Sequence, residues 1–211
     1  YWMRRGYWQE EYQWLTRLLA LPQTAPPTLV RAKVLTHAGH LALRLVDSAT
    51  AVLFYQESLA LARQLQSMPD TVMALLGLGD SQTDHATAQI LYEESLALSR
   101  AADYEAGAAR SLTVLGHLAS GAGHYQEAQR LYEEALAIQR KLGDRKAATG
   151  LLRNLGIGAF AQQEYQTAKK IYEECLRTYN EWGDKPGIVA VLNDLADVAL
   201  VDGDFATATS M

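Results

Sequence analysis

The chain has 211 residues, a net charge of −5 at pH 7, 49% apolar residues and 20% charged residues. This composition is typical of a folded globular protein and argues against disorder. The acidic balance argues against nucleic acid as a direct partner, because neutralising phosphates requires a clustered basic face. The apolar runs are far shorter than the ~18–20 residues that a membrane span needs, so we expect no membrane partner.

The single cysteine, Cys175, excludes an internal disulfide framework. A reducing compartment, and hence a cytoplasmic location, is the expectation that follows. The opening residues carry aromatic and acidic side chains where a signal peptide would place its apolar segment. We interpret the chain as a piece excised from a longer protein.

The first 28 residues are expected to be a helical lead-in followed by a proline-rich linker. Trp2, Trp8 and Trp14 are predicted to pack within the lead-in helix. The linker is predicted over residues 21–28, where Pro22, Pro26 and Pro27 interrupt the helical pattern.

The rest of the chain, residues 29–211, repeats itself. One decapeptide pattern begins at Phe54, Leu91, Leu131 and Ile171, at intervals of 37, 40 and 40 residues. A second apolar block precedes each copy, and a fifth such block begins at Val191. The predicted repeats cover about residues 31–68, 69–107, 108–147 and 148–187, with a truncated repeat over 188–211.

Both blocks of each repeat have the periodicity of an amphipathic helix. Gly143 and Gly183 stand where a helix would end, and the aspartate after each is a plausible N-cap of the next helix. The second repeat is three residues short. We therefore expect the helix over about residues 70–79 to end one turn early, to bury less surface than its equivalents and to open early.

Small and aromatic residues recur at fixed places in the repeats. Gly116 and Gly156 are expected to let two antiparallel helices approach closely. The recurring tyrosines of the second helices, Tyr92, Tyr132 and Tyr172, are predicted to pack outward.

The order Leu-Gly, Tyr, Ala and aromatic residue resembles the tetratricopeptide repeat over about residues 31–211. The resemblance implies an all-α fold, a right-handed superhelical solenoid of antiparallel helix pairs. The amino-acid sequences of the decapeptides are also similar to those in the helical-repeat regions of large bacterial LuxR-like and STAND-type ATPase regulators. ATPase activity does not carry over, because no glycine-rich stretch ends in the Gly-Lys-Ser/Thr of a phosphate-binding loop.

Catalytic, cofactor and metal sites are not expected, so the chain is predicted not to be an enzyme. The adjacent glutamates that recur in each decapeptide point about 100° apart on a helix, which indicates an exposed face rather than an acid/base pair. His40 and His117 are two repeats apart, too far to share a metal ion. Cys175 occupies a position held by serine or alanine in the other repeats, as a small buried residue would.

The family resemblance implies that the first helix of each pair lines the concave side of the array. The exposed positions of those helices are therefore the candidate binding residues: Lys33, Thr36, His40, Arg44, Arg110, Thr113, His117, Arg153, Ile157, Asn193 and Asp197. Asn154 and Asp194 lie where related repeats often present a side chain to a peptide backbone. Arginine, histidine and asparagine donors in a groove suit a peptide of acidic character, whereas solvent-exposed residues of this kind also have a purely structural explanation.

These observations predict a protein- or peptide-binding scaffold, or a sensor module, of a larger bacterial signalling or transcription-regulating protein. The alternatives are a sensor that holds a small-molecule effector and an architectural array that mediates self-assembly. The apolar helix over residues 189–201 is followed by only a short segment. We therefore expect the chain to form a homodimer through this C-terminal edge, which the longer parent protein would cover.

Overall fold

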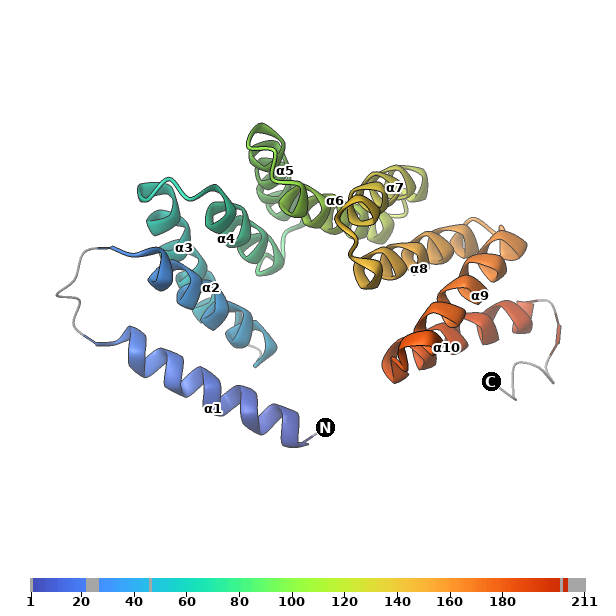
Figure 1. Ribbon diagram of the computed structural model, residues 1–211, viewed down its shortest axis with the longest axis horizontal. Helices are drawn as coiled ribbons and strands as arrows, with labels where there is room; N and C mark the ends of the chain where they lie inside the picture. The colour runs from blue at the N-terminus through green and yellow to red at the C-terminus, as the bar shows by residue number, and fades with distance from the viewer. Residues whose placement is uncertain (1, 22–26, 46, 202, 205–211) are drawn as a thin grey trace. The chain divides into compact units, whose positions relative to one another are not determined.

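The computed structural model describes residues 2–21, 27–45, 47–201 and 203–204, with the side chains of residues 2–6 excepted (Figure 1). Over these residues the chain is all-α, and no strand occurs among them. The helices are α1 (Trp2–Leu19), α2 (Leu29–Arg44), α3 (Ser48–Gln64), α4 (Met68–Asp80), α5 (His85–Ala101), α6 (Glu105–Gly121), α7 (Tyr125–Leu142), α8 (Arg145–Ala161), α9 (Tyr165–Trp182) and α10 (Lys185–Val201). Most of the predicted linker lies outside the described residues.

The chain divides into two compact units, residues 1–111 and 112–211, and the division falls within α6. In the first unit, each of the helices α1 to α4 packs against the next, and α2 also contacts α4. In the second unit, α7 to α10 pack in the same successive manner, and α8 contacts α10. Each unit is therefore built of antiparallel helix pairs whose first helices are neighbours, as the sequence predicts.

The predicted helix ends are confirmed at two junctions. Gly143 and Gly183 adopt the left-handed conformation, with φ of 74° and 64°, at the ends of α7 and α9. This conformation lets the chain leave a helix without a steric penalty. Asp144 and Asp184 then accept hydrogen bonds from backbone N–H groups in the first turns of α8 and α10.

The recurring tyrosines face inward, and the prediction that they pack outward is wrong. Tyr55, Tyr92, Tyr132 and Tyr172 are each at most 6% exposed. The ring of each lies against a glycine of a first helix, where a Cβ atom would come within 2.2–2.8 Å of the ring: Gly39 and Gly77 for Tyr55, Gly79 for Tyr92, Gly116 for Tyr132, and Gly156 for Tyr172. The glycines thus make room for an aromatic ring rather than for a second backbone.

One further position of the second helices is small and fully buried, as predicted for Cys175. Ser58, Ser95, Ala135 and Cys175 all have 0% exposure. The Ser58 hydroxyl donates to the carbonyl oxygen of Ala32 on α2, so the small slot also joins the two helices of a pair.

Helix α4 is short, as predicted, but it is not poorly buried. It has 13 residues, against 17 in α8 and α10, and nine of the 13 are buried. The helix packs against α2, α3 and α5, and its apolar residues 72–79 meet neighbours on several sides. The expectation that the short repeat buries less surface is therefore wrong, because the missing turn removes length from the end of the helix and not from its packed centre.

Candidate functional site

In residues 1–111, the first helices bring a small polar cluster together. Lys33, Met73 and Arg110 occupy equivalent positions on α2, α4 and α6. Arg110 is exposed, and its Nη1 lies 3.4 Å from the sulfur of Met73. Lys33 is also exposed. This row therefore presents two cations to solvent from one face of the unit.

Next to this row lie His40 and Asp80, which hold equivalent positions on α2 and α4. The His40 ring meets the ring of Tyr55 at 5.5 Å in an edge-on arrangement. The hydroxyl of Tyr92 donates to Oδ1 of Asp80 at 2.8 Å. Burial, followed by the nearby charge of Arg110, lowers the pKa of His40, so its imidazole is neutral at pH 7.

The hydroxyl of Tyr55 is buried without a hydrogen-bond partner among the described residues. Burial, reinforced by the Asp80 carboxylate, raises its pKa well above the ordinary value, so the phenol stays protonated. An unsatisfied buried hydroxyl costs free energy unless water or a ligand bonds it.

Two of the predicted groove residues on α2 contact other helices. Thr36 is only 8% exposed, and its hydroxyl lies 2.8 Å from that of Ser58. Its predicted place on the exposed face is therefore wrong, because the position faces α3. Arg44 is exposed, but its guanidinium lies 4.8 Å from the ring of Trp8 on α1.

Helix α1 covers the side of α2 to which Arg44 belongs. Glu11 of α1 lies 2.8 Å from Nε2 of His37, close to the Trp8–Arg44 contact. Residues 2–19 form helix α1, but Trp14 does not pack in it as predicted. The Trp14 side chain is 65% exposed, with only Arg17 of its own helix stacked on it.

In residues 112–211, the predicted site residues pair with one another. Arg153 on α8 bonds both carboxylate oxygens of Asp194 on α10. Nδ2 of Asn154 donates to Nε2 of His117 at 2.9 Å. The sequence predicts that Arg153 is free to bind a ligand in the groove. This prediction is wrong, because Arg153 is paired with Asp194. Thr113 is half-buried, and the exposed candidates of this unit are His117, Ile157, Asn193 and Asp197.

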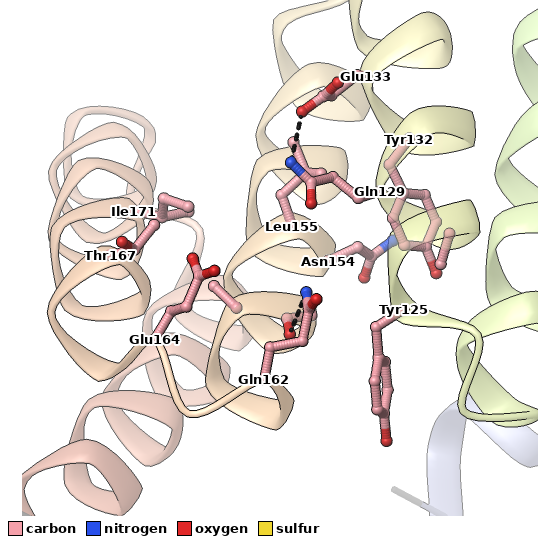
Figure 2. A pocket seen from close by; sticks show the side chains of 13 residues that line it. Tyr125, Gln129, Tyr132, Glu133, Asn154, Leu155, Gln162, Glu164, Thr167 and Ile171 are labelled. Atoms are coloured by element: carbon pink, nitrogen blue, oxygen red, sulfur yellow. Dashed lines mark hydrogen bonds between the residues drawn. The ribbon is translucent and has the colours of Figure 1, made fainter.

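A cavity of about 110 Å³ lies between α7, α8 and α9 (Figure 2). Asn154 lines it together with Gly158, Gln162 and Glu164, of which only Asn154 was a candidate from the sequence. The cavity could have been predicted from a comparison of the repeats. The position of Gly158 carries Leu41, Ser81, Leu118 and Val198 in the other repeats.

The described residues offer no other obvious chemistry. They contain no group of three or more histidine, cysteine or carboxylate side chains that could hold a metal ion. Within the same residues, none of the helices combines the length and apolarity needed to cross a membrane.

The repeat pattern decides the family. The family described as "Tetratricopeptide repeat" matches residues 70–141 and 147–211, which together are well over half of the chain. The chain belongs to the tetratricopeptide repeat family. No curated protein matches it in sequence.

Solved tetratricopeptide-type structures share the fold at low sequence identity. BtubC (BKLC) from P. vanneervenii is 17% identical with a TM-score of 0.76, over 98% of this chain and 85% of that one. A Signal Transduction ATPase with Numerous Domains (STAND) protein with a tetratricopeptide repeat sensor, from Pyrococcus horikoshii, is 11% identical with a TM-score of 0.77; the match covers 99% of this chain and 33% of that one. A Rap protein complexed with Competence and Sporulation Factor is 17% identical with a TM-score of 0.75, over 86% of this chain and 52% of that one. The tetratricopeptide chain thus spans about a third of the STAND protein and half of the Rap protein.

Proposed function

We propose that this tetratricopeptide repeat chain is a non-catalytic module that binds an acidic peptide segment. The proposal rests on the exposure and the hydrogen bonding of the Arg110 side chain. Its guanidinium is exposed and contacts the sulfur of Met73, with no carboxylate bonded to it among the described residues. An exposed guanidinium that bonds no carboxylate of its own chain can donate hydrogen bonds to a carboxylate of a partner.

The two units differ in what they offer to such a peptide. In residues 1–111, Lys33 and Arg110 form an exposed basic row beside the carboxylate of Asp80. In residues 112–211, Arg153 is neutralised by Asp194, and Asp197 remains exposed. We therefore assign the acidic part of the ligand to the first unit.

The polar groups beside Arg110 suit the backbone of a peptide. A peptide unit carries one donor and one acceptor. The Asp80 carboxylate is exposed on α4 and accepts hydrogen bonds, so it can bond a peptide N–H. Asp80 and Arg110 together complement an extended segment whose backbone N–H bonds Asp80 and whose acidic side chain bonds Arg110.

A sensor module of a larger bacterial signalling or transcription-regulating protein is the context that we propose for this binding. Among the structural neighbours are a STAND protein with a tetratricopeptide repeat sensor and a Rap protein complexed with Competence and Sporulation Factor. The buried Cys175 is compatible with a reducing, cytoplasmic compartment. A small-molecule effector is the alternative, but the cavity of about 110 Å³ between α7, α8 and α9 is small for one.

Selection from a random octapeptide library tests the proposal. We expect the 211-residue chain to enrich peptides with aspartate and glutamate, and Arg110→Ala to lose that enrichment. Arg177→Ala is the matched control, because Arg177 is exposed on α9, away from the first-helix row. Enrichment that survives in Arg110→Ala, or a consensus without acidic residues, would contradict the proposal.

A further inference from the structure

The cavity between α7, α8 and α9 exists because one first helix lacks a side chain. Gly158 lies at the position of Leu41, Ser81, Leu118 and Val198, and a Cβ atom built on it meets nothing within 4 Å. In α2 and α10 the equivalent side chains are buried, with exposures of 3% for Leu41 and 1% for Val198. The hollow is thus a local departure from the repeat, bounded by neighbouring helices of one unit.

The side chains that line the cavity carry negative charge without a positive counterpart. Two carboxylates, Glu133 and Glu164, line the cavity, whereas neither lysine nor arginine does. The Glu164 side chain forms no hydrogen bond or ion pair with any other described residue, although it stands at the N-cap of α9. A carboxylate is thus left at the mouth of the cavity without a cation.

The amide side chains add unused acceptor oxygens to the lining. Nε2 of Gln129 donates to Glu133 at 2.9 Å, and Nε2 of Gln162 donates to the carbonyl oxygen of Gly158 at 3.2 Å. Nδ2 of Asn154 donates to His117. Each of these nitrogens uses one of its two N–H donors within the protein, whereas no hydrogen bond to the three side-chain carbonyl oxygens occurs among the described residues. Figure 2 shows these side chains arranged around the hollow.

The aromatic lining and the volume of the cavity indicate which class of ligand it can bind. Tyr125, which is half-buried, lines the cavity, and a tyrosine face attracts a cation. A volume of about 110 Å³ exceeds the need of one water molecule and falls short of a drug-sized ligand. The space fits one side-chain-sized group.

We propose that the Gly158 cavity binds a guanidinium or ammonium group. Such a group donates several N–H bonds to the carboxylates and amide oxygens, and it supplies the positive charge that the lining lacks. The source is either an arginine or lysine side chain of a peptide segment or a free small amine. This site is separate from the acidic-peptide site proposed on residues 1–111.

Nuclear magnetic resonance titration of the 211-residue chain tests the site. N-propylguanidinium should shift the amide signals of Gly158 and Gln162, whereas the uncharged N-propylurea should not. Gly158→Leu, which restores the residue found in α2 and α6, should abolish the shifts. Glu164→Gln should weaken binding about threefold or more, as expected for the loss of one exposed ion pair. Because the Glu164 side chain forms no hydrogen bond or ion pair with the described residues, this second variant folds even if Gly158→Leu does not.

Glu173→Gln is the matched control, because it removes the same charge from an exposed position of α9 outside the cavity lining. Equal binding of the urea, equal binding by all three variants, or shifts confined to other helices would overturn the proposal. Acetyl-Gly-Arg-Gly-amide then distinguishes the sources. Tenfold tighter binding than the free guanidinium assigns the site to a peptide segment, and equal binding assigns it to a small amine.

Discussion

The guanidinium of Arg153 on α8 holds the carboxylate of Asp194 on α10, with Nη2 donating to Oδ1 at 3.0 Å and Nε donating to the other oxygen. The two side chains are 31% and 14% exposed. Their helices are neighbouring first helices of residues 112–211, and each residue had been a candidate for binding a ligand. The pair joins two repeats, and this role distinguishes Arg153 from Arg110.

Arg153→Ala should lower the free energy of unfolding by about 1–3 kcal/mol, because it leaves a largely buried carboxylate without its donor. Arg110→Ala should change it by less than about 0.5 kcal/mol, as exposed substitutions usually do. Urea unfolding followed by circular dichroism measures both. Adding Asp194→Ala to Arg153→Ala should recover part of the loss, and equal effects of the two single variants would contradict the assignment.

Two glycines of one helix should respond in opposite directions to the same substitution. Gly156→Ala should destabilise by about 1–3 kcal/mol, because its Cβ atom would lie 2.5 Å from Cε1 of Tyr172. Gly158→Ala should stabilise by about 0.5–1 kcal/mol, because its Cβ atom meets open space and alanine favours the helix. Thermal unfolding of both variants is the measurement, and a shift of the same sign in both would exclude this description of the packing.

Amide hydrogen exchange should be slow in α4 despite its shortness. Residues 74–79 are all buried between α2, α3 and α5, so their amides should exchange only through a substantial opening. Exposed amides of the following turn, such as Thr83, should exchange far faster. Faster exchange over 74–79 than over the centre of α8 would restore the expectation, drawn from the sequence alone, that this repeat opens early.

The Cys175 thiol should resist modification in the folded chain. It has 0% exposure, and burial raises its pKa to about 12. We expect no reaction with a disulfide reagent at pH 8, and complete reaction in denaturant. A native thiol that reacts within minutes would contradict the burial.

The raised pKa of Cys175 also gives stability a pH dependence. The folded thiol stays protonated, whereas the unfolded thiol ionises near its ordinary pKa of ~8.5. This contribution is therefore complete below pH ~8.5 and is lost as pH rises towards 12. The fall in unfolding free energy over this range should be smaller in Cys175→Ala, which copies the alanine of the preceding repeat, Ala135. An identical fall in both proteins would show that other groups cause it.

Self-association should depend on the exposed side of α10. Val189, Leu200 and Val201 are 47–58% exposed, whereas Leu195 is 5% exposed. We expect the 211-residue chain to dimerise at ~100 µM, which corresponds to about −5.5 kcal/mol, and Leu200→Lys to weaken that dimer in sedimentation equilibrium. Leu195→Lys is unsuitable as a probe because it would disrupt the core. A monomer at this concentration, or a dimer indifferent to Leu200→Lys, would contradict the expectation.

The sequence by itself determined the elements of this protein. The spacing of the decapeptides, the helical stripes and the Gly-Asp junctions at 143–144 and 183–184 predicted an all-α array of helix pairs, since each of these signals is local to one helix or one turn. The small slot of Cys175 was also predictable, because the other repeats carry serine or alanine there.

Only the tertiary structure decided which neighbour each side chain meets. Helical periodicity reports that a residue such as Tyr132 or Thr36 lies on a given side of its helix, but not which other helix covers that side. The inward tyrosines, the burial of α4 and the Arg153–Asp194 pair all depend on contacts between different helices. The Gly158 cavity arises in the same way, because a missing side chain leaves a hollow only where the surrounding helices do not close over it.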